Sequence, residues 1–415
     1  MGGDVVPEFS IKDKCKVNTN READTFVGLV CEEGDISIHF PLGFHVSDDD
    51  KSLRRDIMLL LSTIGNTIGH KESTYNTISP NSILIGFPIQ AYLSVIYDYM
   101  ERGYYIEREV EYTLSKKGKI NWAKTIKSVK PTIQDEEVYY LNFITRRNRI
   151  NEDNLITLIH EYCVYESFLK IGWLFTSGLP QLPRIKRNDK LFLSVLRDKI
   201  SHTYNDKNKT LFKNMMLIIK NLSDEDAPLN YKYGTYIFEY VWEAMIDRVY
   251  GIEGKDAYFP KTTWNVGGRN FNNASLEPDS IMIRGNSIYV LDAKYYKFGA
   301  TKWLGDLPES TSINKQITYG EYVAKNKGEG SQVYNAFIMP FDSDDDKWET
   351  NPIFAIGEAT GDWRQNDKLY ERIQGIMVDV KYLMQISVRE DMSEINKLAD
   401  CIESAVRGNN ESYNI

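Results

Sequence analysis

The sequence has few of the residues that mark secreted, zinc-binding or membrane-spanning proteins. It contains four cysteines in 415 residues, and no pair of them has zinc-ligand spacing. The five histidines form no HxH or HxxxH cluster, and no apolar run reaches the ~18 residues of a membrane-spanning helix. Residues 1–13 include three acidic side chains and no apolar core, unlike a signal peptide. We therefore expect a cytoplasmic protein with reduced thiols.

A nucleotide-binding P-loop is also missing from the sequence. The nearest match, residues 65–71 (GNTIGHK), lacks the GxxxxGK[ST] order in which backbone amides and a lysine hold phosphates. We interpret this segment as a helix end followed by a turn. The chain accordingly shows no nucleotide-hydrolysing machinery of its own.

Acidic residues outnumber basic ones, but the two kinds are unevenly distributed. The net charge is −9, whereas residues 113–220 contain 20 Lys+Arg and 10 Asp+Glu, a net charge of +10 that leaves −19 for the remainder. Six lysines and no acid lie between residues 113 and 130. Four of these lysines are candidate contacts to a nucleic-acid backbone: Lys116, Lys117, Lys119 and Lys124. The alternative is a solvated basic face without a partner.

Periodicity and turn residues predict two regions before the C-terminal part of the chain. Residues 1–150 form an α+β domain, a winged-helix-like or partner-docking module, with expected strands at 26–30, 36–40, 104–114 and 120–126 and helices at 52–67 and 88–101. Residues 151–226 form a helical middle region. An acidic segment that ends in proline, residues 223–228, marks the boundary to the next domain.

Helices and strands alternate in the third region, residues 227–415. A helix is expected at 235–250, followed by a long loop that contains four glycines. Strands are then expected at 280–283, 287–291, 332–339 and 352–356, a helix from residue 312, and helical or mixed structure at 369–386. The fold class is therefore mixed α/β, with a sheet flanked by helices at the C-terminal end of the chain.

The most informative motif joins Pro278-Asp279 to Asp292-Ala293-Lys294. A short strand, an Arg-Gly-Asn turn and an apolar strand lie between them, which is the pattern of PD-(D/E)XK nucleases. The hairpin would bring Asp279 and Asp292 to one divalent metal ion, with the Ala293 carbonyl as a further ligand. Lys294 lies two residues after Asp292 and shares its face, where an ammonium group can offset developing negative charge. The alternative is an exposed hairpin end with a surface Asp–Lys pair.

Two neighbouring segments could complete such a site. The helix before the motif carries Glu239 and Glu243 four residues apart on one face. Glu243 is the first candidate for a third acidic group and Glu239 the second, against the alternative of a solvated acidic face. In the helix after the motif, Gln316 and Tyr319 are one turn apart and could reach the site. The alternative places Tyr319 in the core and Gln316 on the solvated surface.

These segments resemble the LlaJI-type restriction endonucleases, which are similar to the McrC nuclease subunit. The resemblance rests on FEYVWEAM at 238–245, Pro278-Asp279, VLDAKYY at 290–296, LPESTSINKQITY at 307–319 and residues 370–384, with LSKKGKINWAKTI at 114–126 in the N-terminal half. It implies an Mg²⁺-dependent endonuclease, with Mn²⁺ as an alternative ion, that acts on double-stranded DNA in defence against foreign DNA. It also implies an McrB-like AAA+ GTPase partner. Asp279, Asp292 and Lys294 match the motif residues of the family.

Two other functions stay open from the sequence. A DNA-binding or scaffold subunit could have a nuclease-like fold without activity, although the intact Asp279, Asp292 and Lys294 set argues against this. A nuclease directed at RNA or at particular nucleic-acid structures would use the same metal chemistry.

Overall fold

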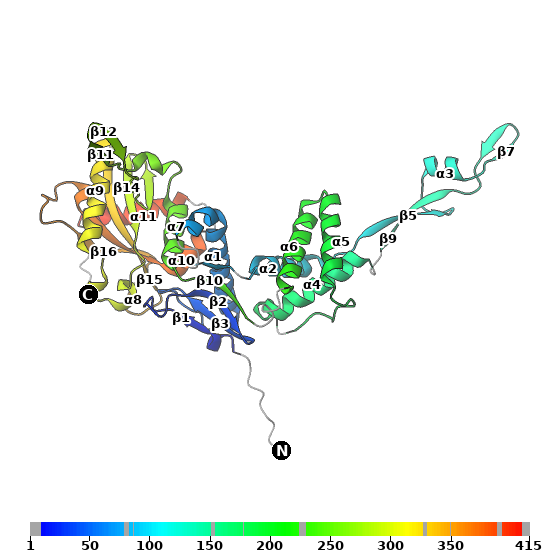
Figure 1. Ribbon diagram of the computed structural model, residues 1–415, viewed down its shortest axis with the longest axis horizontal. Helices are drawn as coiled ribbons and strands as arrows, with labels where there is room; N and C mark the ends of the chain where they lie inside the picture. The colour runs from blue at the N-terminus through cyan, green and yellow to red at the C-terminus, as the bar shows by residue number, and fades with distance from the viewer. Residues whose placement is uncertain are drawn as a thin grey trace, which may run out of the picture. The chain divides into compact units, whose positions relative to one another are not determined.

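The computed structural model describes residues 10–78, 83–85, 87–150, 154–176, 178–223, 230–326, 330–348, 350–387 and 392–408. The chain forms two compact units: unit 1 contains Met1–Gly86 and Leu229–Ile415, and unit 2 contains Phe87–Pro228 (Figure 1). This division differs from the expected domains 1–150, 151–226 and 227–415, because the first 86 residues belong with the C-terminal region. Most of the expected boundary segment, residues 224–228, lies outside the described residues.

A strand that the sequence analysis missed explains this grouping. Strand β10 (Tyr231–Thr235) pairs antiparallel with β2 (Val27–Glu32) on one side and with β4 (Ile83–Ile85) on the other. The five-stranded sheet is completed by β3 (Asp35–Phe40) and β1 (Cys15–Val17), in the order β1-β3-β2-β10-β4. The expected strands at 26–30 and 36–40 are thereby confirmed. The expected helix start at residue 235 is wrong, because residues 231–235 complete this sheet and α7 begins at Phe238.

The long helix of unit 1, α1 (Asp50–Ile78), contains the expected helix at 52–67 and continues past it. The interpretation of residues 65–71 as a helix end and turn is wrong. Isolated glycines are tolerated within helices, and the first proline after residue 50 is Pro80. Among the described residues, no helix is both long and apolar enough to cross a membrane.

The second sheet of unit 1 is a mixed sheet in the C-terminal region. Its strands are, in spatial order, β13 (Ser280–Arg284), β14 (Ser287–Ala293), β15 (Gln332–Phe341), β17 (Ile373–Asp379) and β16 (Ile353–Ala359). The three central strands β14, β15 and β17 are parallel, and the two outer strands run antiparallel to their neighbours. This confirms the mixed α/β fold class. It also resolves the mixed segment 369–386 into β17 followed by α10 (Val380–Ile386).

Helices cover this sheet on both faces. Helix α9 (Ser310–Asn326) packs its Tyr319 and Val323 against Ile281, Ile288 and Val290 of β13 and β14. Tyr289, which points to the opposite face, donates a hydrogen bond from its hydroxyl to Glu403 of α11 (Met392–Val406). Helix α7 (Phe238–Tyr250) packs on β13, β14 and α11. Strands β13 and β14 are therefore contacted by both α7 and α9.

Unit 2 consists of a helical part and a smaller β part (Figure 1). Its larger helices are α2 (Ile89–Arg102), α4 (Leu155–Ile171), α5 (Asp189–His202) and α6 (Asp206–Leu222). Its strands are β5 (Arg108–Leu114), β6 (Lys119–Ile120), β7 (Thr132–Gln134), β8 (Glu137–Tyr139) and β9 (Ile144–Ile150). The expected strand at 120–126 is wrong beyond Ile120. There the Asn121 side chain accepts a hydrogen bond from Lys124 N–H and starts helix α3 (Trp122–Ser128).

Candidate active site

The hairpin of β13 and β14 brings the two aspartates of the motif together. Ser280 pairs with Leu291 in the antiparallel register, so Asp279 and Asp292 follow as the next opposed positions. The hairpin turns at Gly285, whose φ of +57° suits the first central position of a type II′ turn. The Ala293 N–H donates a 2.7 Å hydrogen bond to Asp279 Oδ2, which fixes the Asp279 carboxylate at the end of β14.

The backbone carbonyl of Ala293 lies on the same side of β14 as its N–H. In an antiparallel ladder, the N–H and C=O of one residue point toward the same neighbouring strand. Since the Ala293 N–H points to Asp279, the Ala293 carbonyl also points to the Asp279 side of β14. The sheet therefore gathers two carboxylates and one carbonyl oxygen at this edge.

Lys294 pairs directly with Asp292. The distance from Lys294 Nζ to Asp292 Oδ2 is 2.5 Å, and the two side chains are 17% and 5% exposed. Burial acts to lower the pKa of Lys294, but the charge of Asp292 and its hydrogen bond outweigh burial and raise that pKa. The lysine is therefore cationic at neutral pH, in a site that is largely shielded from water.

The carboxyl group of Asp279 is strongly perturbed by its surroundings. Burial, followed by the negative charges of Asp292 and Glu243, raises the pKa of Asp279 to about 8. The Ala293 hydrogen bond and the Lys294 charge oppose this increase. Three acidic groups therefore repel one another at one point, and a bound cation would relieve that repulsion.

Glu243 and Glu239 occupy different environments on α7. Glu243 is partly buried, and its charge acts on Asp279. Glu239 is exposed, and its charge acts on Tyr295 instead. Both line a pocket of about 500 Å³ that also includes Ala293 and Lys294. This placement favours Glu243 as the third acidic group.

Helix α9 buries both Gln316 and Tyr319, which confirms the alternative that places Tyr319 in the core. Gln316 is 1% exposed, and its Nε2 donates to the Val290 carbonyl at 2.8 Å and lies 3.4 Å from Asn335 Oδ1. The alternative of a solvated Gln316 is therefore wrong, and these contacts fasten α9 to β14. Tyr319 is fully buried and donates from its hydroxyl to the Glu277 carbonyl at 3.2 Å.

Lys315 is a residue of this site that the sequence analysis missed. Its ammonium group lies 5.4 Å from the centre of the Tyr319 ring. Burial acts to lower the pKa of Lys315, but Tyr319 and the charge of Asp292 raise it, while Lys294 opposes that increase. Two lysines therefore lie near Asp292. The sequence feature that could have indicated Lys315 is its position one helical turn before Tyr319 in the segment KQITY.

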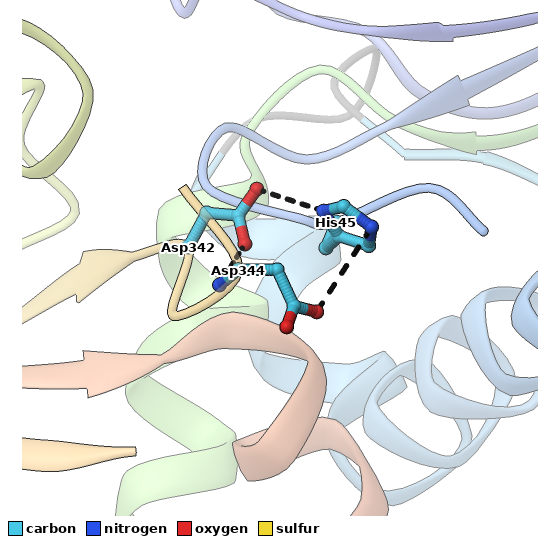
Figure 2. A group of neighbouring side chains, drawn as sticks. All are labelled: His45, Asp342 and Asp344. Carbon is cyan, nitrogen blue, oxygen red and sulfur yellow. Dashed lines mark hydrogen bonds and ion pairs between the residues drawn. The ribbon is translucent and has the colours of Figure 1, made fainter. Parts of the chain in front are cut away.

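A second group of metal-binding residue types lies elsewhere in unit 1. His45 Nδ1 is 3.3 Å from Asp342 Oδ2, and His45 Nε2 is 3.9 Å from Asp344 Oδ2 (Figure 2). One ligand atom from each residue can be chosen so that all lie within 4.8 Å of one another. Asp342 directly follows β15 and lies five residues beyond Phe337, the register partner of Asp292, which is roughly 16 Å along the strand direction. One ion cannot bridge the two places.

The four candidate lysines of unit 2 are exposed around β5, β6 and α3. Lys116, Lys117 and Lys119 lie in and beside the turn after β5, and the Lys117 N–H donates to Ser115 Oγ at 3.0 Å. Lys124 lies on α3, with its ammonium group 3.5 Å from the centre of the Tyr112 ring. The structure therefore places all four on one solvent-accessible part of unit 2.

The mixed sheet and the acidic groups beside Lys294 are the features expected of a restriction-endonuclease protein, and comparison with known sequences identifies the family. A profile of the LlaJI restriction endonuclease family matches residues 26–355. The chain belongs to the LlaJI restriction endonuclease family, and the resemblance identified from the sequence is confirmed.

A curated protein and a solved structure are also similar to this chain. The Type II restriction enzyme BsuMI component YdjA of Bacillus subtilis (strain 168) is 26% identical over 321 residues, which are 71% of this chain and 67% of that protein. A structure of Thermococcus gammatolerans McrB AAA+ hexamers with bound McrC matches 91% of this chain and 82% of the compared chain. In that comparison the sequence identity is 15% and the TM-score is 0.38.

Proposed function

We propose that this protein is the cleavage subunit of a restriction system and hydrolyses phosphodiester bonds of double-stranded DNA with a divalent metal ion. The observation that carries the proposal is the convergence of Asp279, Asp292 and Lys294 where β13 begins and β14 ends. Membership of the LlaJI family supports DNA as the substrate.

The residues present suit a hard divalent cation such as Mg²⁺, or Mn²⁺ in its place. Such ions prefer oxygen ligands and retain several water molecules. Asp279, Asp292 and the Ala293 carbonyl would hold the ion, and Glu243 would complete the set from α7. Burial and then the repulsion from Asp292 and Glu243 raise the pKa of Asp279. This fits the assignment, because a cation stabilises buried carboxylates that destabilise one another without it.

Each side chain of the site has a distinct role in this proposal. A bound ion would polarise the phosphoryl group and activate water. Lys294, held against Asp292, would orient the attacking water and offset the negative charge that develops on the phosphate. Lys315, on α9, would add a second positive charge near Asp292 and attract the phosphates of the DNA backbone. Gln316 would act as a positioning residue, since it holds α9 against the Val290 carbonyl.

A cleavage assay on several nucleic acids tests this proposal. Purified protein would be incubated with supercoiled plasmid, linear duplex DNA and duplex RNA, in Mg²⁺, in Mn²⁺ and in EDTA. We expect nicked or linear DNA only where a metal ion is present. Binding of DNA without cleavage, with and without the partner described next, would instead identify a non-catalytic DNA-binding or scaffold subunit. Preferential cleavage of RNA would overturn the assignment of the substrate.

The proposal includes an McrB-like AAA+ GTPase partner, which the resemblance to the McrC subunit implies. The chain has no P-loop sequence of its own, and the Bacillus subtilis relative is named as a component of a restriction enzyme. We expect weak or non-specific cleavage by the isolated chain and efficient, site-dependent cleavage once the partner and GTP are added. Efficient sequence-specific cutting by the chain alone would refute partner dependence and leave the metal site unaffected.

A further inference from the structure

A two-stranded ribbon precedes the Asp279 motif, in a segment that the sequence analysis took for a loop. Strands β11 (Thr263–Val266) and β12 (Arg269–Asn272) pair antiparallel and are joined by Gly267 and Gly268, with φ of +59° and +75°. Two successive residues with positive φ form a type I′ turn, whose twist matches that of paired strands. The ribbon is labelled in Figure 1 beside the C-terminal sheet.

The base of the ribbon is fixed close to the candidate active site. The pairing continues below the two strands, because the Asn273 N–H donates to the Thr262 carbonyl and the Leu276 N–H to the Pro260 carbonyl. Phe259 is buried just before this base. Asp279 is the third residue after Leu276, a span of at most about 11 Å. The ribbon therefore emerges beside the residues proposed to hold the metal ion.

The two faces of the ribbon have different chemistry. Trp264 lies opposite Phe271 and Val266 opposite Arg269, so these four side chains share one face. The three apolar ones among them are 63–67% exposed. An isolated two-stranded hairpin is marginally stable in water. A surface of this kind is therefore expected to have a binding partner.

The other face carries polar side chains that bridge the strands. Thr263 Oγ1 donates to Asn272 Oδ1, and Asn265 Nδ2 donates to Asn270 Oδ1, each at 2.8 Å. The Asn265–Asn270 hydrogen bond uses one of the two N–H groups of the Asn265 amide and one lone pair of the Asn270 amide oxygen. Each of these amides therefore keeps further donor and acceptor capacity. The bridges hold the amide planes in a row along the ribbon.

From these observations we propose that the β11–β12 ribbon contacts duplex DNA beside the cleaved bond, with its amide face reading base edges. Three properties of the segment favour DNA as the occupant. Residues 260–276 contain Lys261 and Arg269 and no acid, within a chain of net charge −9. A two-stranded ribbon fits the major groove, and asparagine amides pair with the edge of adenine. The aromatic and Arg269 face would lie against sugars and phosphates. The assignment rests on the proposed function, since it takes DNA to be the substrate.

The test measures DNA binding without cleavage, so that its failure is distinguishable from failure of the nuclease proposal. Wild-type protein and variants would be mixed with a pool of randomised 30-base-pair duplexes in Ca²⁺, alone and together with the AAA+ partner and GTP. Affinity and enriched sequences would both be determined. The variants are Trp264→Ala with Phe271→Ala for one face and Asn265→Ala with Asn270→Ala for the other. Trp363→Ala is the matched control, because Trp363 is also exposed, at 54%, and lies outside the ribbon.

We expect the aromatic variant to lose about fivefold or more in affinity for all sequences, and the amide variant to lose the wild-type sequence preference. Trp363→Ala should match the wild type in both respects. Wild-type affinity and preference in both ribbon variants would overturn the proposal and indicate that the ribbon docks on a protein. An amide variant with lower affinity but unchanged preference would overturn base reading. A wild-type protein that enriches no sequence from the pool, either alone or with the partner and GTP, would overturn it as well.

Discussion

The backbone N–H of Ala293 donates a hydrogen bond to the carboxylate of Asp279 over 2.7 Å. This contact joins the residue before β13 to the last residue of β14 and places Asp279 beside the Asp292–Lys294 pair. One end of a hairpin thereby acquires three charged side chains that could act on a single phosphate group.

Metal binding should release a proton at neutral pH. Burial, Asp292 and Glu243 raise the pKa of Asp279 to about 8, so the metal-free protein holds a proton there at pH 7, and a cation must displace it. Affinity for Mg²⁺ should rise with pH up to about 8 and then level off. Calorimetry in two buffers with different ionisation enthalpies measures the release directly. Binding of Mg²⁺ without proton release by the wild-type protein would contradict the assignment.

The same shift should make the stability of the metal-free protein fall as pH rises. An acidic group with a raised pKa in the folded state binds more protons when the protein is folded than when it is unfolded. The free energy of unfolding therefore decreases as the pH rises from the pKa of the unfolded state to the pKa of the folded state. For Asp279 that window runs from about 4 to about 8. Urea unfolding in EDTA across this range, compared between the wild type and Asp279→Asn, should show a smaller decrease in the variant.

Glu243 and Glu239 provide a matched pair of substitutions on one helix. Glu243→Gln should weaken Mg²⁺ binding more than Glu239→Gln, because the charge of Glu243 acts on Asp279 and that of Glu239 acts on Tyr295. Calorimetric titration of both variants measures the difference. Equal effects, or a larger effect of Glu239→Gln, would remove Glu243 from the metal site.

Lys294→Ala should separate metal binding from cleavage. The lysine contacts Asp292 and supplies positive charge rather than a ligand atom. We expect the cleavage rate to fall by about 10²–10³-fold, as on removal of other groups that stabilise a transition-state charge, while Mg²⁺ affinity is better retained than in Asp292→Ala. Single-turnover cleavage and calorimetry on both variants measure this. Full activity of Lys294→Ala would exclude Lys294 from the reaction.

The exposed lysines of unit 2 should contribute to DNA affinity by neutralising phosphates. Replacing Lys116, Lys117 and Lys119 with alanine should weaken binding and reduce the slope of log affinity against log salt by about one for each phosphate that is no longer neutralised. The control replaces three lysines of α6: Lys207, Lys209 and Lys213. An unchanged affinity and slope in the first variant would instead favour docking of a partner protein on this segment.

The sequence predicted those parts of the site that are close together along the chain. Asp279 and Asp292 are 13 residues apart. The two short apolar runs between them are joined by the tight turn at Gly285, which sets their register, so the local sequence was sufficient to place the two aspartates. Lys315 could not be assigned in this way, because its position near Asp292 depends on how α9 packs across the sheet. The buried state of Gln316 depends on the same packing.

The helices and strands within each region of the chain were largely predictable, whereas the pairing of strands from distant regions was not. Strand β10 contains Gly234, and its neighbour β2 contains Gly28, some 200 residues earlier in the chain. A Cβ atom at Gly234 would lie 2.2 Å from the Val27 carbonyl oxygen, so the two strands pair closely through two small residues. Glycine is unfavourable in isolated strands, and local propensity therefore gave no reason to expect β10 or to group residues 1–86 with the C-terminal region.

Cleavage of supercoiled plasmid by the wild type and by Asp292→Ala, each in Mg²⁺ and with and without the partner and GTP, tests the central claim most directly. The control is Asp367→Ala, since Asp367 is an exposed aspartate that pairs only with the neighbouring Lys368 among the contacts observed. We expect metal-dependent nicking or linearisation by the wild type and by Asp367→Ala, and none by Asp292→Ala although it remains folded. Cleavage by Asp292→Ala at the wild-type rate would contradict the assignment of the active site.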